Sequence, residues 1–204
     1  AVRRRAVDPR GALAAAGGMG ADALHDLELP LLFGTLVRGG AYVGWGVDSA
    51  DWHLAQALLR QCGGATAAAV MLDAVPMLAG LLDPKRDVML RLTALSLLEH
   101  LLADATFAAS NDLSDWAEHI YEAMLLPNLV WRAGKPSEQI RLAAYRCLSR
   151  LTQLDKLAAA ALASRQQTAL PLYVSGLDDD HVDTRRLACA VLALAAAARH
   201  SNPS

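Results

Sequence analysis

The sequence predicts an all-α protein built as a solenoid of stacked helical hairpins, and three observations support this prediction. Alanine and leucine supply 41 and 37 of the 204 residues, whereas only two isoleucines occur, so helix formers outnumber the residues that favour sheets. One sequence pattern recurs three times: a proline in an apolar run, followed 14 or 15 residues later by an arginine. The prolines, Pro76, Pro127 and Pro171, lie 51 and then 44 residues apart, a spacing typical of helical-hairpin repeats.

Each arginine is followed by small or apolar residues at offsets of three, seven and ten, which share one face of a helix. The small residue at the first of these offsets allows another helix to approach closely, and the larger ones fill the seam. The equivalent residues are Arg91, Ala94, Leu98 and Leu101 in the first copy, Arg141, Ala144, Leu148 and Leu151 in the second, and Arg185, Ala188, Leu192 and Ala195 in the third.

Residues 1–20 are rich in Arg, Ala and Gly with little periodicity, which predicts a flexible lead-in. We expect residues 21–204 to form a single domain. It begins with a degenerate hairpin over 21–64, whose helices at 21–36 and 51–61 flank a loop over 41–50 that contains the aromatics Tyr42 and Trp45.

Three regular hairpins are expected to follow, over 65–104, 111–153 and 164–200. The first pairs helices at 66–82 and 88–103, with Asp87 as the cap of the second. The second pairs a helix at 112–131 with one that Ser137 caps and that runs to 152. The third has a helix ending near Leu177 and another from Asp183 to 199. We also expect a short helix over 155–163. Ser164 is expected to start the next helix and to form a capping box with Gln167.

Charge and cysteine content limit the class of partner. The formal net charge is −2, so no overall field attracts nucleic acid or an anionic membrane. The longest apolar run, 187–198, is too short to span a bilayer. Cys62, Cys147 and Cys189 lack CxxC spacing, which favours reduced, half-buried thiols. We therefore expect a soluble, cytoplasmic protein, and the missing initiator Met suggests a piece of a longer one.

Catalytic and cofactor motifs were sought in the sequence and not found. It contains no GxSxG, no HExxH and no phosphate-binding loop, and the acidic run 178–180 lacks the spacing of a calcium loop. We predict a protein that is not an enzyme and that has no cofactor and no metal. A repeat-type enzyme, with carboxylates or histidines converging from different helices, stays open as an alternative.

A proline in a bent first helix, a short turn that often carries Asp, and a second helix with an early Arg followed by Ala resemble HEAT repeats of the armadillo-like class. The resemblance covers Thr66 to Arg199. It implies that Arg91, Arg141 and Arg185 form a structural ladder with turn carboxylates. The candidate carboxylates are Asp83, Asp87 and Asp178, whereas the second turn offers only Ser137 and Glu138.

A narrower resemblance rests on the segment LPNLVWRAGKPSEQIRLAAYRCL, Leu126 to Leu148, and on the later Asp178–Asp180 run followed by Thr184, Arg185 and Cys189. These segments are similar to the C-terminal HEAT repeats of the dynein axonemal assembly factor family. The resemblance implies a cytoplasmic, non-catalytic scaffold that assists preassembly of axonemal dynein arms. Its partners would be proteins, among them dynein chains, co-chaperones and other assembly factors, and neither nucleic acid nor membrane.

The turns between paired helices are the candidate protein-binding surface, because solenoids commonly bind partners there. The candidate residues are Lys85, Arg86, Trp131, Arg132 and Lys135. For Trp131 two interpretations stay open, an exposed binding residue or an indole packed across the next helix pair. The alternative function is a tubulin-binding HEAT array or another generic HEAT-repeat adaptor, although the acidic third turn argues against binding to the acidic surface of tubulin.

Overall fold

The computed structural model describes residues 21–62, 65–104, 116–154 and 166–201. Within these ranges the chain forms helices joined by turns and contains no strand. None of the described helices is long and apolar enough to cross a membrane. The expected lead-in over 1–20, the short helix over 155–163 and the helix start at Ser164 lie outside the described residues.

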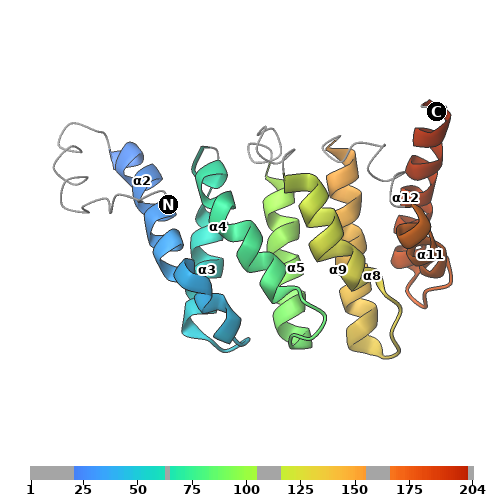
Figure 1. The fold of residues 1–204 in the computed structure, drawn as a ribbon, viewed down its shortest axis with the longest axis horizontal. Coiled ribbons are helices and arrows are strands. Elements are labelled where there is room, and N and C mark those ends of the chain that lie inside the picture. The colour runs from blue at the N-terminus through green and yellow to red at the C-terminus, as the bar shows by residue number, and fades with distance from the viewer. Residues whose placement is uncertain (1–20, 63–64, 105–115, 155–165, 202–204) are drawn as a thin grey trace, which may run out of the picture.

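The helices form an elongated row of two layers (Figure 1). One layer holds the second helices of successive pairs, because α3 (Ala50–Gln61) contacts α5 (Val88–Ala103), which contacts α9 (Lys135–Gln153), which contacts α12 (Val182–Ser201). The other layer holds the first helices. There α2 (Ala21–Val37) contacts α4 (Ala65–Leu81), α4 contacts η2 (Ile120–Leu125), and α8 (Leu126–Leu129) contacts α11 (Gln166–Leu177). Figure 1 shows the turns within the pairs along one edge of this row.

The first pair, α2 and α3, has the predicted helices, and the loop expected over 41–50 is non-helical only over 45–49. Residues Arg38–Gly44 form a 3₁₀ helix, η1, entered through positive φ angles of 67° at Gly39 and 78° at Gly40. Glycine adopts this conformation without a Cβ clash, so the backbone can leave right-handed helical geometry at these two residues. Trp45 then lies buried, 6% exposed, against Trp52 of α3.

The second pair, α4 and α5, matches the predicted helices closely. The predicted cap of α5 is confirmed, because the Asp87 carboxylate accepts hydrogen bonds from the backbone N–H groups of Met89 and Leu90. These are two of the N–H groups that the first turn of a helix leaves unpaired. Pro76 lies inside α4 with its side chain exposed.

The third pair corrects the sequence prediction at both ends of its turn. The first helix ends at Leu129 rather than at Trp131, so Val130 and Trp131 belong to the turn. The second helix, α9, begins at Lys135 from Gly134, and Ser137 is therefore not its cap. Pro136 explains the earlier start, because its fixed φ suits the first turn of a helix.

A π-helical segment, η2, precedes α8 in this pair, and the sequence did not reveal it. The backbone N–H of Leu126 bonds to the carbonyl of Tyr121, five residues earlier. Pro127 has no N–H to donate and its ring would crowd the carbonyl of residue 123 in a regular helix. The wider π turn accommodates both effects at this position.

The fourth pair, α11 and α12, has the predicted helices, and α12 starts one residue before Asp183. The face predicted from the offsets is buried in α5 and α9, where Arg91, Arg141 and the Ala and Leu positions that follow them are all buried. In α12 the same face is only partly covered. Ala188 and Ala195 are buried, whereas Arg185 is exposed, because no later described helix packs on the far side of α12.

Candidate functional site on the turn ridge

The sequence-selected residues lie together on one edge of the molecule, which we call the turn ridge: η1 and the turns 82–87, 130–134 and 178–181. Trp131 is 54% exposed there, and the Lys135 side chain is 76% exposed and 3.5 Å from the Glu138 carboxylate. Lys85 and Arg132 are also exposed, whereas Arg86 is half-buried. The indole of Trp131 therefore does not pack inside the next helix pair, although its partner-binding role remains a prediction.

Arg86 joins its turn to the preceding pair through backbone carbonyls. Its two terminal nitrogens donate to the carbonyls of Tyr42, Val43 and Trp45, at 3.3, 2.6 and 2.5 Å. These carbonyls belong to the end of η1 and the residue after it, and that of Tyr42 also accepts the backbone N–H of Trp45. Arg86 Nε is buried and has no hydrogen-bond partner. The cation is thus held by neutral acceptors alone.

Arg91 is 5% exposed and is also held by a neutral partner. Its Nε and Nη2 donate to Asn128 Oδ1, and Asn128 Nδ2 in turn donates to the carbonyls of Leu82 and Met124, at 3.0 and 2.7 Å. Asn128 therefore ties α5 to the end of α4 and to the next pair. Burial lowers the pKa of Arg91, the nearby Arg132 charge lowers it further, and Asp83 opposes both effects.

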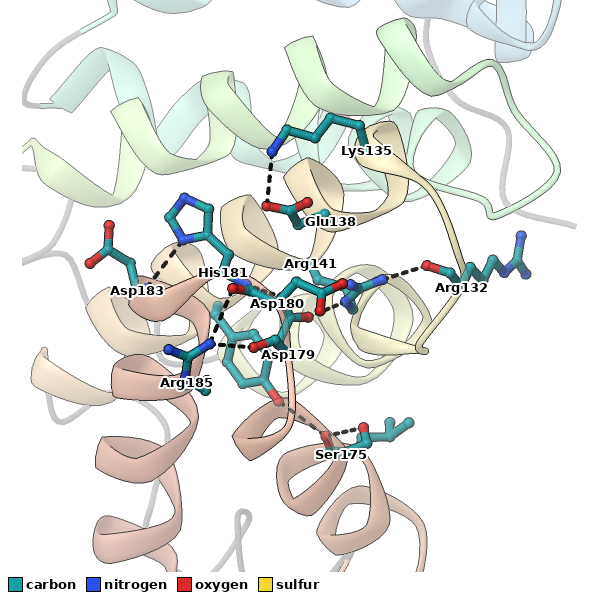
Figure 2. Close-up of polar contacts among 12 residues, drawn as sticks. Arg132, Lys135, Glu138, Arg141, Ser175, Asp179, Asp180, His181, Asp183 and Arg185 are labelled. Atoms are coloured by element: carbon teal, nitrogen blue, oxygen red, sulfur yellow. Dashed lines mark hydrogen bonds and ion pairs between the residues drawn. The ribbon is translucent and has the colours of Figure 1, made fainter.

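Arg141, at the equivalent position of α9, has a carboxylate partner instead (Figure 2). Its Nε lies 2.5 Å from Asp179 Oδ2, and its Nη1 donates to the carbonyl of Arg132 at 2.7 Å. Both side chains of the ion pair are almost fully buried, at 4% and 0% exposed. The guanidinium also lies over the Trp131 ring, 5.9 Å from its centroid, in a cation–π contact.

Arg185 differs again, because it bonds to its own turn. Its Nη1 donates to the carbonyls of Asp179 and Asp180, at 2.7 and 3.1 Å (Figure 2). Arg141 and Arg185 thus bond to turn residues, whereas Arg91 bonds to Asn128 of α8. Of the three arginines expected to pair with turn carboxylates, only Arg141 does so.

The carboxylates named for the ladder have other roles, and this corrects the sequence prediction. Asp83 accepts the backbone N–H of Lys85, and Asp87 caps α5. Asp178 is exposed, and the buried acid that pairs with Arg141 is its neighbour Asp179. In a run of three aspartates the sequence cannot show which one points inward, because a turn has no fixed periodicity.

A cavity of about 120 Å³ lies on the ridge between the turns 82–87 and 130–134. The cationic residues Arg86, Arg91 and Arg132 line it together with apolar and neutral polar side chains, and no Asp or Glu is among the lining residues. The remaining lining residues are Pro84, Val88, Pro127, Asn128, Val130, Ser137 and Ile140. Asn128, which the sequence analysis did not select, is recognisable afterwards as a polar residue inside the apolar run LLPNLV.

The described residues include no metal-binding cluster, and two of their three thiols are buried. No three His, Cys, Asp or Glu side chains among them gather closely enough to hold a metal ion. Cys62 and Cys147 are buried free thiols and burial raises the pKa of both, whereas Cys189 is exposed rather than half-buried as predicted. A raised pKa keeps a thiol protonated and weakly nucleophilic.

The fold and the ridge define an all-helical array of paired helices whose edge carries exposed basic and apolar side chains beside an acidic third turn. Its sequence is similar to dynein axonemal assembly factor 5 from mouse, with 31% identity over 150 residues, and from human, with 29% over 154 residues. These matches cover 72% and 74% of this chain and 18% of each relative. The Xenopus laevis protein of the same name is 29% identical over 120 residues, 58% of this chain and 14% of its own.

These similarities support the resemblance to the dynein axonemal assembly factor family, and the chain spans less than a fifth of the length of these relatives. No family model matches the chain. No solved structure matches it either.

Proposed function

We propose that this chain is a non-catalytic, HEAT-type α-solenoid that binds client proteins during cytoplasmic preassembly of axonemal dynein arms. The observation that carries the proposal is the similarity to dynein axonemal assembly factor 5 over most of this chain. The two-layered row of paired helices supports the solenoid part, because each pair contacts only its neighbours in such an array.

The turn ridge is the surface that we propose for client binding. It presents Trp131, which is large and half-exposed, beside Arg132 and Lys135, and aromatic and arginine side chains dominate binding energy at protein interfaces. The buried guanidinium of Arg141 contacts one face of the exposed indole through the cation–π interaction. A fixed aromatic side chain loses little conformational entropy when a partner covers it.

The proposal is tested by affinity capture from ciliated-cell cytoplasm, followed by mass spectrometry of the bound proteins. We expect dynein chains or their assembly factors among them. Capture of tubulin instead, confirmed by co-sedimentation at low salt, would support the alternative of a tubulin-binding array. If neither dynein-related proteins nor tubulin were captured, the proposed function would be contradicted.

A single substitution tests the ridge itself. Trp131→Ala should reduce client capture about tenfold or more, the loss typical of an interface hot spot, while the thermal midpoint stays within a few degrees because the indole is half-exposed. Leu54→Ala is the matched control, since Leu54 is 50% exposed on α3 and away from the ridge. Equal capture by the wild type and Trp131→Ala would exclude this residue from the binding surface.

A further inference from the structure

The cavity between the turns 82–87 and 130–134 is lined by three arginine residues and by no acidic residue. We propose that it is an oxyanion-binding site that takes one carboxylate or phosphate group from a segment of a client protein. The inference rests on the proposed client-binding function and specifies the chemistry of the client.

Arg91 and Arg141 stand at equivalent positions of α5 and α9 but have different partners. Arg141 is neutralised by the buried carboxylate of Asp179, whereas Arg91 meets only the amide oxygen of Asn128. Both are almost fully buried, so each charge has lost most of its hydration. A buried cation without a carboxylate partner is stabilised by an anion that enters from outside.

The other charged residues around the cavity also favour an anion as its ligand. Arg132 is exposed, and Figure 2 shows its side chain extending away from the Arg141–Asp179 pair. Arg132 and Arg91 line the same cavity, and the charge of Arg132 lowers the pKa of Arg91. Asp83, which opposes this effect, accepts the N–H of Lys85 and does not line the cavity.

Residues that line the cavity also carry hydrogen-bond donors. Ser137 has a hydroxyl and Arg132 an exposed guanidinium side chain, and both residues line this space. An anion placed here would receive charge-assisted hydrogen bonds, which are stronger than neutral ones and suit the planar fork of arginine.

Size and surroundings limit the ligand. A volume of about 120 Å³ corresponds to roughly four water molecules, enough for a carboxylate or phosphate group but not for a nucleotide. Pro84, Val88 and Val130 provide apolar walls for the methylene groups of an acidic side chain. The rest of the client segment would lie outside the cavity, next to the exposed Trp131.

The test uses the full chain labelled with ¹⁵N at arginine side chains, with inorganic phosphate and acetate as probes. Each probe is added at constant ionic strength while the Nε–Hε resonances are followed by NMR. We expect saturable shifts for a small group of arginines, and the probe with the lower Kd indicates whether phosphate or carboxylate is preferred. Linear shifts without saturation would overturn the proposal.

Two substitutions that each remove one positive charge, and a third that keeps it, provide the comparison. Arg132→Ala should weaken the binding of the preferred probe about tenfold, and Arg132→Lys should restore part of it. Arg146→Ala removes the same side chain from an exposed position on α9 that does not line the cavity, and it should leave the Kd unchanged. An equal loss in Arg132→Ala and Arg146→Ala would mean a diffuse charge effect and no site.

The fold should survive this test, because Arg141 contacts the backbone carbonyl of Arg132 and not its side chain. The outcome is also separable from that of client capture. Anion binding without any captured dynein subunit would reject the proposed function and keep the site. Captured dynein subunits without saturable anion binding would reject the site alone.

Discussion

Individual residues on the turn ridge show how one repeated arginine acquires different partners. Arg91, Arg141 and Arg185 stand at the same place in their helices, yet they bond to an amide, a carboxylate and two carbonyls respectively. The choice of partner depends on the turn, and the turn sequences differ. The Arg141–Asp179 pair is the most buried of these contacts, and we expect it to be the most sensitive to substitution.

Asp179→Ala should lower the free energy of unfolding by about 3 kcal/mol, because it leaves the buried Arg141 without a counter-charge. Asp178→Ala removes an exposed carboxylate from the adjacent position and should change it by less than about 0.5 kcal/mol. Urea unfolding followed by circular dichroism measures both values. Similar losses in the two variants would show that Asp179 is not the functional partner of Arg141.

At the scale of helices, close approach in the last pair depends on a glycine. Gly176 in α11 lies between α9 and α12. A Cβ at this position would be 2.8 Å from Tyr145 Cζ, 2.9 Å from Ala188 Cβ and closer still to the Tyr145 hydroxyl. Ala188 is the small residue that follows Arg185 by three positions in the recurring sequence pattern, and it is fully buried. Small residues on both helices therefore set how closely the pair packs.

Gly176→Ala should destabilise the protein by about 1–3 kcal/mol through overpacking, although alanine favours helices more than glycine does. Gly44→Ala is the control, because a Cβ there meets no atom within 4 Å. Thermal unfolding of the two variants provides the comparison. A Gly176→Ala protein as stable as the wild type would show that α11 can shift without loss.

The whole molecule buries several groups that ionise only in alkaline solution. Desolvation raises the pKa of Cys62 from 9.0 to about 11 and also raises that of Cys147. It likewise raises the pKa of Tyr145 and Tyr173, and the hydrogen bond between Tyr121 and Tyr173 adds to the effect on Tyr173. These groups come from different helix pairs, so the effect is spread along the row.

Stability should therefore fall in alkaline solution. Below pH 9 the Cys62 thiol is neutral in both states, whereas between pH 9 and 11 it ionises in the unfolded chain first and favours unfolding. The free energy of unfolding, measured in urea at successive pH values, should decline over this range. Cys62→Ala should show a shallower decline, while Cys189→Ala, whose thiol is exposed, should follow the wild type.

The helices were largely predictable, and the turns were not. The recurring Arg, Ala and Leu positions of α5 and α9 are buried as their spacing predicted, because helical periodicity fixes which residues share a face. Pro127 did not predict the π-helical segment η2, since the equivalent prolines Pro76 and Pro171 lie in helices without such a segment. Trp131, expected at a helix end, belongs to a turn.

The sequence by itself determined that the chain is helical, where its helices lie and which face of each is buried. These properties depend on composition and on local periodicity, which can be read from neighbouring residues of the sequence. Only the tertiary structure decided that Asp179 neutralises Arg141, that Asn128 contacts Arg91, and that three arginines line one cavity. Those contacts join residues about 40 positions apart, and the path of the turns, which carries no periodicity, determines which of them meet.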